Sequence, residues 1–278
     1  MKTMILGASG LLGKELFREW TFDEVIGLSS RDVDIRDAGQ VREVVEKSRP
    51  EWIVLAAAYT NVDDCEKHPD LAFAVNRDGA VNVAEAAKRI GAAMLFLSSD
   101  YVFDGKKRSP YETRDQRNPQ SVYGRSKAEA EVQLLQVLPE CCIARTSWLF
   151  GAGGKCFPDT ILKLAATRPV LEVVNDQRGC PTYAVDLARA IIDLCRSRAH
   201  GIVHTTNSGD CSWFEFAREI IKGAGLGTEM RPVSSQQMAR PAPRPAYSVL
   251  SAKSLQQYGI AMPTWPDALE RYLRERKN

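Results

Sequence analysis

The sequence lacks long apolar runs and any strong excess of charge of one sign. Its apolar runs, such as WIVLAAAY, are far shorter than the roughly 20 residues of a membrane-spanning helix. The 278 residues include 37 basic and 35 acidic side chains, a net charge of +2, whereas nucleic-acid and membrane surfaces call for a basic excess. We therefore expect a protein with no membrane span and no nucleic-acid partner.

The sequence also lacks a disulfide framework and a metal-ligand pattern. It has seven cysteines with no C-x-x-C, and the adjacent Cys141 and Cys142 would point to opposite faces of a strand. Reduced thiols fit best, and MKTMILGASG leads directly into a strand, so we expect a cytoplasmic protein without a signal peptide. Among three histidines only His200 and His204 are close together, and their loop-and-strand context predicts no metal site.

The first half of the chain alternates apolar strands with helices. The predicted strands are segments 2–6, 24–30, 52–58, 92–100 and 141–150, and helical segments separate them. Strands that are apolar throughout are buried on both faces, which is typical of a parallel sheet covered by helices. The prediction is an α/β fold with a Rossmann-like, doubly wound parallel sheet.

After about residue 150 the alternation becomes less regular. Short strand-like segments follow helices, and RPAPRP at 240–245 is a Pro-rich loop. We expect a dinucleotide-binding domain over residues 1–150, with some later segments returning to it. A smaller α/β substrate lobe over 151–278 would close a cleft at the carboxyl edge of the sheet.

A glycine-rich turn, GASGLLG, joins the first strand to the first helix. Glycines at these positions permit a tight turn and close backbone approach to a pyrophosphate, which then faces the helix N-terminus. The alternative is a turn that only packs the two elements together. We predict dinucleotide binding by this turn, through Gly7, Ser9, Gly10, Leu11, Leu12 and Gly13.

The second strand lacks the acidic residue that an NAD site places at its end for the ribose 2′-hydroxyl. It ends in GLSSRD instead, and Ser29, Ser30 and Arg31 suit a 2′-phosphate, although Arg31 is also compatible with an ordinary exposed arginine. NADPH is therefore the favoured cofactor, with NADH possible. Further cofactor contacts are expected from Asp34, Ile35, Ala56, Ala57, Ala58, Tyr59, Tyr123 and Lys127.

Three residues in order suggest a carbonyl reductase. Ser99 ends the fourth strand, and Tyr123 and Lys127 lie four residues apart, on one face of a predicted helix. Tyr123 would donate a proton to a carbonyl oxygen, Lys127 would lower its pKa, and Ser99 would orient the carbonyl. The neighbours Ser98, Asp100 and Tyr101 would face the same cleft.

These motifs resemble the extended short-chain dehydrogenase/reductase superfamily. SSDYVFDG, YGRSKAEAE, RTSWLFG and VVNDQRGCPTYAVDLA resemble, more narrowly, the dTDP-4-dehydrorhamnose reductase family over nearly the whole chain. The resemblance implies NADPH-dependent reduction of the 4-keto group of dTDP-6-deoxy-L-lyxo-4-hexulose to dTDP-L-rhamnose. It implies catalytic roles for Ser99, Tyr123 and Lys127, and substrate contacts by Trp148, Asn175, Arg178, Pro181 and Arg244.

Two departures from the family pattern are visible. Tyr247 stands where Asn is common, which affects nucleotide contacts, and Val185 stands where some magnesium-bridged dimers have Glu, although Glu15 matches their other ligand. We expect no magnesium site, and either a monomer or a homodimer. Three alternatives stay open: the NADP-binding regulatory subunit of methionine adenosyltransferase, a nucleotide-sugar epimerase or dehydratase, and a reductase of another nucleotide-linked keto sugar.

Overall fold

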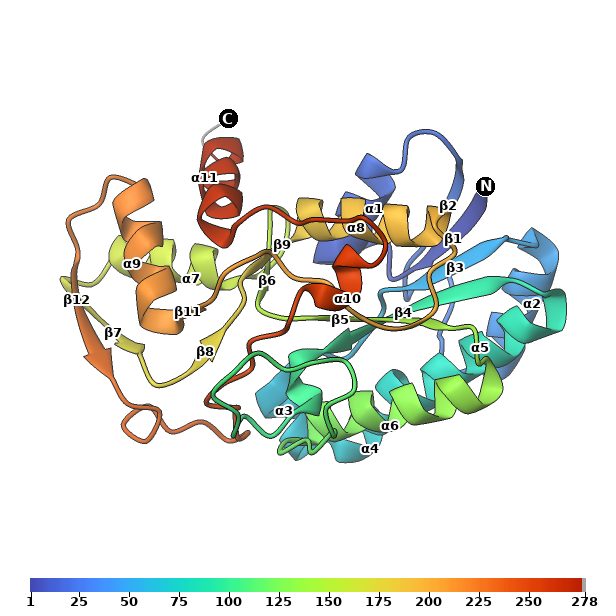
Figure 1. Cartoon of the computed structure of the whole chain (residues 1–278), viewed down its shortest axis with the longest axis horizontal. Helices are drawn as coiled ribbons and strands as arrows, with labels where there is room; N and C mark the ends of the chain where they lie inside the picture. Colours follow the sequence, from blue (N-terminus) through green and yellow to red (C-terminus); the bar gives the residue numbers. More distant parts are fainter. Residues whose placement is uncertain (277–278) are drawn as a thin grey trace.

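A six-stranded parallel sheet, in the order β10-β5-β4-β3-β1-β2, forms the centre of the larger half of the molecule (Figure 1). The computed structural model describes residues 1–276. The strands are β1 (Lys2–Leu6), β2 (Glu24–Leu28), β3 (Trp52–Leu55), β4 (Ala93–Ser99), β5 (Cys142–Thr146) and β10 (Gly201–His204). Each adjacent pair is parallel, so the predicted doubly wound sheet is confirmed.

Helices cover both faces of this sheet. On one face lie α2 (Ala38–Ser48), α5 (Gly79–Ile90) and α6 (Val122–Val137), and on the other α1 (Leu11–Glu19) and α8 (Ala184–Arg196). Cys141 packs into the first of these cores and Cys142 into the second. Each fully buried aliphatic side chain in such a core contributes about 1.5–3 kcal/mol.

The chain reverses its direction of travel across the sheet at β1. Both β2 and β3 pair with β1, on opposite sides of it. In doubly wound sheets ligands bind outside the carboxyl ends of the strands at such a switch point. The glycine turn after β1 and the serines after β4 both lie at this edge.

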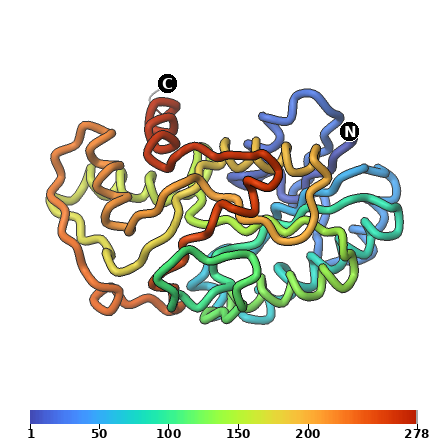
Figure 2. The backbone as a smooth tube through the Cα atoms, viewed as in Figure 1, coloured from blue at the N-terminus to red at the C-terminus, as the bar shows by residue number. Residues whose placement is uncertain are grey.

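The smaller half has a core of its own. Helices α7 (Phe157–Ala165), α9 (Trp213–Gly223) and α11 (Trp265–Glu275) pack around the parallel pair of β7 (Val170–Val174) and β12 (Glu229–Val233). The chain passes between the halves more than once: the short α10 (Lys253–Gln256) returns to the sheet, where Leu255 joins its core (Figure 2). Residues 277 and 278, the last two of the expected substrate lobe, lie outside the described residues.

Three predicted strands are clearly shorter in the structure, and the one predicted over 52–58 already ends at Leu55. The strand predicted over 141–150 is wrong in its second half, because Trp148 has a left-handed φ of 47° and ends the pairing. The chain resumes as β6 (Leu149–Phe150), which pairs with β9 (Thr182–Tyr183) away from the main sheet. Likewise β2 ends at Leu28, so Ser29 and Ser30 lie in a turn.

The chain between β3 and β4 forms several short helical segments before one longer helix. The structure has α3 (Val62–Lys67), α4 (Pro69–Phe73) and a π-helical turn, η1 (Ala74–Asp78), before α5. Within η1 the buried Asn76 accepts a hydrogen bond from Tyr59 N (2.8 Å) and donates to Tyr59 O (3.1 Å) and Ser126 Oγ (3.0 Å). This amide therefore ties the segment after β3 to the helix that carries Tyr123 and Lys127.

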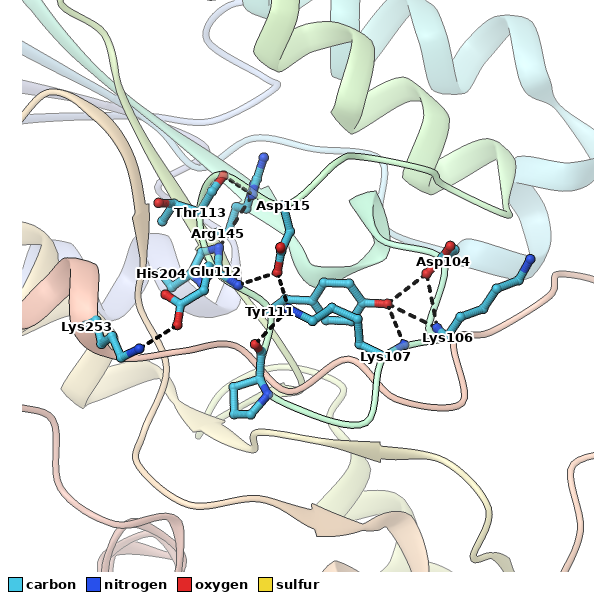
Figure 3. Close-up of polar contacts among 11 residues, drawn as sticks. Asp104, Lys106, Lys107, Tyr111, Glu112, Thr113, Asp115, Arg145, His204 and Lys253 are labelled. Atoms are coloured by element: carbon cyan, nitrogen blue, oxygen red, sulfur yellow. Dashed lines mark hydrogen bonds and ion pairs between the residues drawn. The ribbon is translucent and has the colours of Figure 1, made fainter.

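The side chain of Tyr111 holds the polar loop between β4 and α6 in place. It begins with the 3-10 turn η2 (Asp100–Val102). The Tyr111 hydroxyl donates to Asp104 Oδ1 (2.8 Å) and accepts from the backbone N–H groups of Lys106 (3.1 Å) and Lys107 (3.3 Å) (Figure 3). The loop therefore has a defined path from the serines of β4 to Tyr123.

Three further findings concern the part of the chain that the structure describes. No helix there has both the length and the apolar composition needed to cross a bilayer. All seven cysteines are buried thiols. Between Met1 and Arg276 no group of three His, Cys, Asp or Glu residues is placed to hold a metal ion.

Candidate active site

Ser99, Tyr123 and Lys127 line one cleft of about 440 Å³ at the carboxyl edge of the sheet. Ser99 is the last residue of β4, and α6 begins at Val122, where Ser121 Oγ accepts a hydrogen bond from Gly124 N (3.1 Å). This cap places Tyr123 in the first turn and Lys127 one turn later. A Cβ at Gly124 would lie 2.2 Å from Tyr101 O, so glycine is what allows η2 to approach the helix so closely.

Burial sets the protonation of this trio. Burial raises the pKa of Tyr123, and the Ser99 hydroxyl lowers it by a smaller amount. Burial lowers the pKa of Lys127 to about 7, although the charge of Glu131 opposes this shift. The Lys127 Nζ lies 4.0 Å from the centroid of the Phe96 ring. The sequence predicted that Lys127 lowers the pKa of Tyr123; in the structure burial dominates, so the pKa of Tyr123 is raised overall and its phenol remains a protonated donor.

A buried ion pair lies beneath the trio. Glu131 accepts hydrogen bonds from Arg145 Nε (2.8 Å) and Arg145 Nη2 (2.6 Å), and another from Ser98 Oγ (2.5 Å). Burial raises the pKa of Glu131, but the hydrogen bonds and charge of Arg145 outweigh burial and lower it overall. Ser98 thus lines the cleft as predicted for a substrate contact, but its hydroxyl is directed to Glu131.

The glycine turn forms a cradle in which side chains have no space. A Cβ at Gly7 would lie 2.5 Å from Ala57 N, and one at Gly13 would lie 2.1 Å from Gly7 O. Gly10 is the N-cap of α1 and makes no side-chain cap, so the first N–H groups of this helix stay free for an anion. Gly10, Leu11, Leu12, Gly13, Ala56 and Ala58 all line the cleft, while Ser9 is exposed beside it. This arrangement fits the pyrophosphate of a dinucleotide.

A second hollow, of about 330 Å³, lies beyond the cradle. Its lining includes Gly7, Ser29, Ser30, Asp34, Ile35, Ala57 and Ala58, all of which the sequence singled out. Arg31, which follows Ser30 in the chain, is exposed and does not line the hollow, and its backbone N donates to Ser29 Oγ (3.2 Å). Arg36 also lines the hollow, where it pairs with Asp34 (2.5 Å). Sequence reasoning missed Arg36, because only the turn after β2 brings it back to the hollow.

Two stacked tryptophans close the other side of the cleft. The rings of Trp148 and Trp213 lie parallel, with centroids 3.5 Å apart and an interplanar angle of 6°. Trp213 and Lys155 line the cleft from the smaller half, and sequence reasoning missed both. Their sequence context carries no signal, since the contact depends on how α9 docks against the chain after β5. The other lining residues that were missed are Thr60, Val62, Leu97, Thr146, Ser147 and Leu149.

The remaining predicted substrate residues lie outside this cleft. Arg178 pairs with Asp210 (2.8 Å) and Glu215 (3.1 Å), Asn175 Oδ1 accepts from Ser212 Oγ (2.7 Å), and Pro181 is buried. These contacts brace β8 (Arg178–Gly179) and β11 (Cys211–Ser212) within the smaller half.

Arg244 lies in a neighbouring hollow of about 270 Å³. Arg240 and Gln177 line the same hollow, and Trp213 lines both this hollow and the cleft. The two spaces therefore adjoin at Trp213. Of the predicted substrate residues, Arg244 alone lines this hollow, whereas those around Ser99 line the cleft.

Comparisons with known proteins agree with this geometry. The family described as RmlD substrate binding domain matches residues 1–278. The spore coat polysaccharide biosynthesis protein SpsK of Bacillus subtilis is 43% identical over 279 residues, which cover 100% of this chain and 98% of that protein. The dTDP-4-dehydrorhamnose reductase of Streptomyces griseus is 39% identical over 266 residues, covering 92% and 88% respectively.

A solved structure extends the likeness to three dimensions. The crystal structure of dTDP-4-dehydrorhamnose reductase from Bacillus anthracis, in complex with NADP, is 38% identical in sequence. It superimposes with a TM-score of 0.96 and covers 99% of this chain and 100% of its own.

Proposed function

Since the chain belongs to the dTDP-4-dehydrorhamnose reductase family, we propose that it reduces the 4-keto group of dTDP-6-deoxy-L-lyxo-4-hexulose with NADPH, yielding dTDP-L-rhamnose. The observation that carries this proposal is the meeting of Ser99, Tyr123 and Lys127 beside a glycine cradle in one cleft. Residues 1–150, with α8 and β10, are proposed as the cofactor half, and the later chain as the substrate half.

The residues of the cradle fit NADPH. The N–H groups at the start of α1 would hold the pyrophosphate, and Ser29, Ser30 and Arg31 would hold the 2′-phosphate. The complex of the Bacillus anthracis reductase with NADP supports this choice. When bound, NADPH would supply the hydride that reaches the carbonyl carbon.

Tyr123 completes the reduction on the oxygen. As the carbon–hydrogen bond forms, the C=O π electrons move to the oxygen, which takes the proton of the Tyr123 hydroxyl and becomes an alcohol. A charged Lys127 stabilises the resulting tyrosinate, and Ser99 donates a hydrogen bond to the same oxygen. The tyrosinate then regains its proton from solvent.

The substrate half offers groups for a nucleotide sugar. Trp148 and Lys155 both line the cleft. Arg244 and Arg240 line the adjoining hollow and are suited to a diphosphate. Asn175, Arg178 and Pro181 would act by holding β8 and its neighbours in place.

The test is a spectrophotometric assay at 340 nm with NADPH and the keto sugar made in situ. Wild-type protein should oxidise NADPH only when the sugar is present, and Tyr123→Phe should lower kcat by about 10²–10⁴-fold. Tyr258→Phe, which changes a phenol bonded to His200 O (3.2 Å), should leave kcat unchanged. A loss below threefold in Tyr123→Phe would remove the assigned role.

A second candidate is a reductase of another nucleotide-linked keto sugar. It is favoured by the 43% relative, whose name refers to spore coat polysaccharide and to no particular sugar. Assay of several dTDP-linked 4-keto sugars distinguishes the two, because the true substrate should show the highest kcat/KM.

A further inference from the structure

Asp100 is a buried carboxyl group directly beside the reacting hydroxyls. Its exposed fraction is 1%, and its Oδ1 lies 2.9 Å from Ser99 Oγ. Its Oδ2 is also buried and has no hydrogen-bond partner within residues 1–276. An ionised carboxylate normally accepts hydrogen bonds on both oxygens, so this environment suits a neutral acid.

The hydrogen bonds of Ser99 give Asp100 a specific task. Ser99 Oγ accepts a hydrogen bond from Tyr101 N (3.2 Å) and lies beside the Tyr123 hydroxyl, whose pKa it lowers. A hydroxyl has one proton to donate and two lone pairs that accept. An ionised Asp100 can only accept hydrogen bonds. The single Ser99 proton is then engaged in a hydrogen bond to Asp100, and Ser99 has no proton left to donate to the substrate oxygen.

The arrangement reverses when Asp100 carries a proton. Asp100 then donates to the second lone pair of Ser99, and the Ser99 proton is free to reach the carbonyl oxygen alongside the proton of Tyr123. We propose that Asp100 is a positioning residue that, in its protonated form, donates to Ser99 and thereby turns the Ser99 hydroxyl toward the substrate oxygen. This inference rests on the proposed carbonyl reduction.

The surroundings of Asp100 favour the neutral acid. Burial raises its pKa to about 6, although the hydroxyls of Ser248 and Ser99 and the nearby backbone N–H groups oppose this shift. The groups that face it are uncharged: Ser99 and Tyr101 on its own segment, Tyr123 on α6, Ser248 in the C-terminal loop and Cys180 beside β8. Bound substrate would displace remaining water from the cleft and raise this pKa further.

The pH dependence of kcat separates this role from a structural one. Below its pKa Asp100 donates to Ser99, and as pH rises through the pKa the acid ionises and kcat falls. Lys127 titrates in the same range, so each variant is compared with wild type at the same pH and the effect of Lys127 cancels in the ratio.

Asp100→Asn and Asp100→Ala are the informative variants. The asparagine amide donates to Ser99 at every pH, so the kcat ratio of Asp100→Asn to wild type should rise about 10-fold between pH 5.5 and 8. At pH 5.5 Asp100→Asn should stay within about threefold of wild type, while Asp100→Ala should be about 10-fold slower. In a Ser99→Ala background the kcat ratio should no longer depend on pH, because no Ser99 hydroxyl remains for Asp100 to orient.

Several outcomes would overturn the inference. Equal losses in the Asn and Ala variants, with a ratio that does not change with pH, would leave Asp100 with a structural role only. If Asp100→Asn does not fold, Ser248→Ala provides the test: removing this hydroxyl should move the alkaline fall in kcat to higher pH, and an unmoved profile contradicts us. A wild-type protein inactive on every keto sugar would instead refute the proposed function.

Discussion

Arg244 and Asp63 join the two halves of the molecule. The guanidinium makes two parallel hydrogen bonds, Nη1 to Oδ1 at 3.0 Å and Nη2 to Oδ2 at 2.9 Å, between residues 181 positions apart. Asp63 lies in the first turn of α3, and Arg244 in the Pro-rich loop that follows β12. The hydrogen bond from Arg244 holds the pKa of Asp63 below its usual value.

Removing this pair should weaken substrate binding more than catalysis. A charge-assisted hydrogen bond from Arg244 to the substrate diphosphate would contribute about 1.5–3 kcal/mol. Arg244→Met removes that bond as well as the pair with Asp63, so it should raise KM for the nucleotide sugar about 10-fold or more, with kcat within about threefold. The matched control is Arg231→Met, which removes an exposed pair with Glu229 (2.8 Å) and should change neither constant. Steady-state kinetics at saturating NADPH measure both, and a fall in kcat at unchanged KM would contradict this role.

Lys127 should lower the free energy of unfolding at acidic and neutral pH, although it is needed for catalysis. Its pKa is about 7 in the folded state and about 10.4 in an unfolded chain. Between these values the unfolded chain binds a proton that the folded state does not, so this group makes the protein more stable as pH rises. At pH 6 Lys127→Met should therefore be more stable than wild type by about 2–4 kcal/mol, and inactive.

Urea unfolding at pH 6, 8 and 10 measures this effect. The stability difference between Lys127→Met and wild type should shrink toward pH 10, where the wild-type lysine is neutral in the folded state and roughly 30% neutral in the unfolded chain. The exposed Lys222→Met serves as the control. A difference that grows with pH would show that Lys127 keeps its charge in the folded protein.

Cofactor preference should depend on Arg31. If its guanidinium binds the 2′-phosphate, Arg31→Ala should weaken NADPH binding about 10-fold and NADH binding far less. Fluorescence titration of each cofactor gives the two dissociation constants. Arg36→Ala is the necessary comparison, because Arg36 lines the same hollow. A change of preference in Arg36→Ala alone would transfer the role to Arg36.

The buried pair of Glu131 and Arg145 should be essential for folding stability. Both side chains are almost fully buried, so Glu131→Gln leaves an unpaired guanidinium in the core and should cost about 3–5 kcal/mol. Glu129→Gln, on the same helix, breaks a more exposed pair with Arg77 (3.0 Å) and should cost less than about 1 kcal/mol. Denaturant unfolding of the two variants at pH 7 compares these costs, and equal losses would contradict the burial argument.

Much of the fold follows from local patterns in the sequence. The strands at 2–6, 52–55 and 93–99 are buried on both faces, so their continuous apolar composition was sufficient to predict a parallel sheet. The glycine turn was also predictable, because the space at Gly7 and Gly13 is limited by backbone only a few residues away or on the neighbouring strand. The four-residue spacing of Tyr123 and Lys127 needed only a helix to place them on one face.

Tertiary structure alone decided what these local patterns leave open. The strand predicted over 141–150 breaks at Trp148. The Trp148 ring stacks on the ring of Trp213, which lies in a helix and comes 65 residues later in the chain. Asp100 is buried because Ser248 and Cys180 approach from distant segments. The same burial reverses the expected pKa shift of Tyr123.

The sequence by itself thus determined the order of the elements, the glycine turn and the reactive trio, since each depends on neighbours within one or two helical turns. Only the tertiary structure decided the protonation states and the pairing of Arg244 with Asp63. The physical reason is that hydration and charge at a site are set by every segment packed against it, including those far away in the chain.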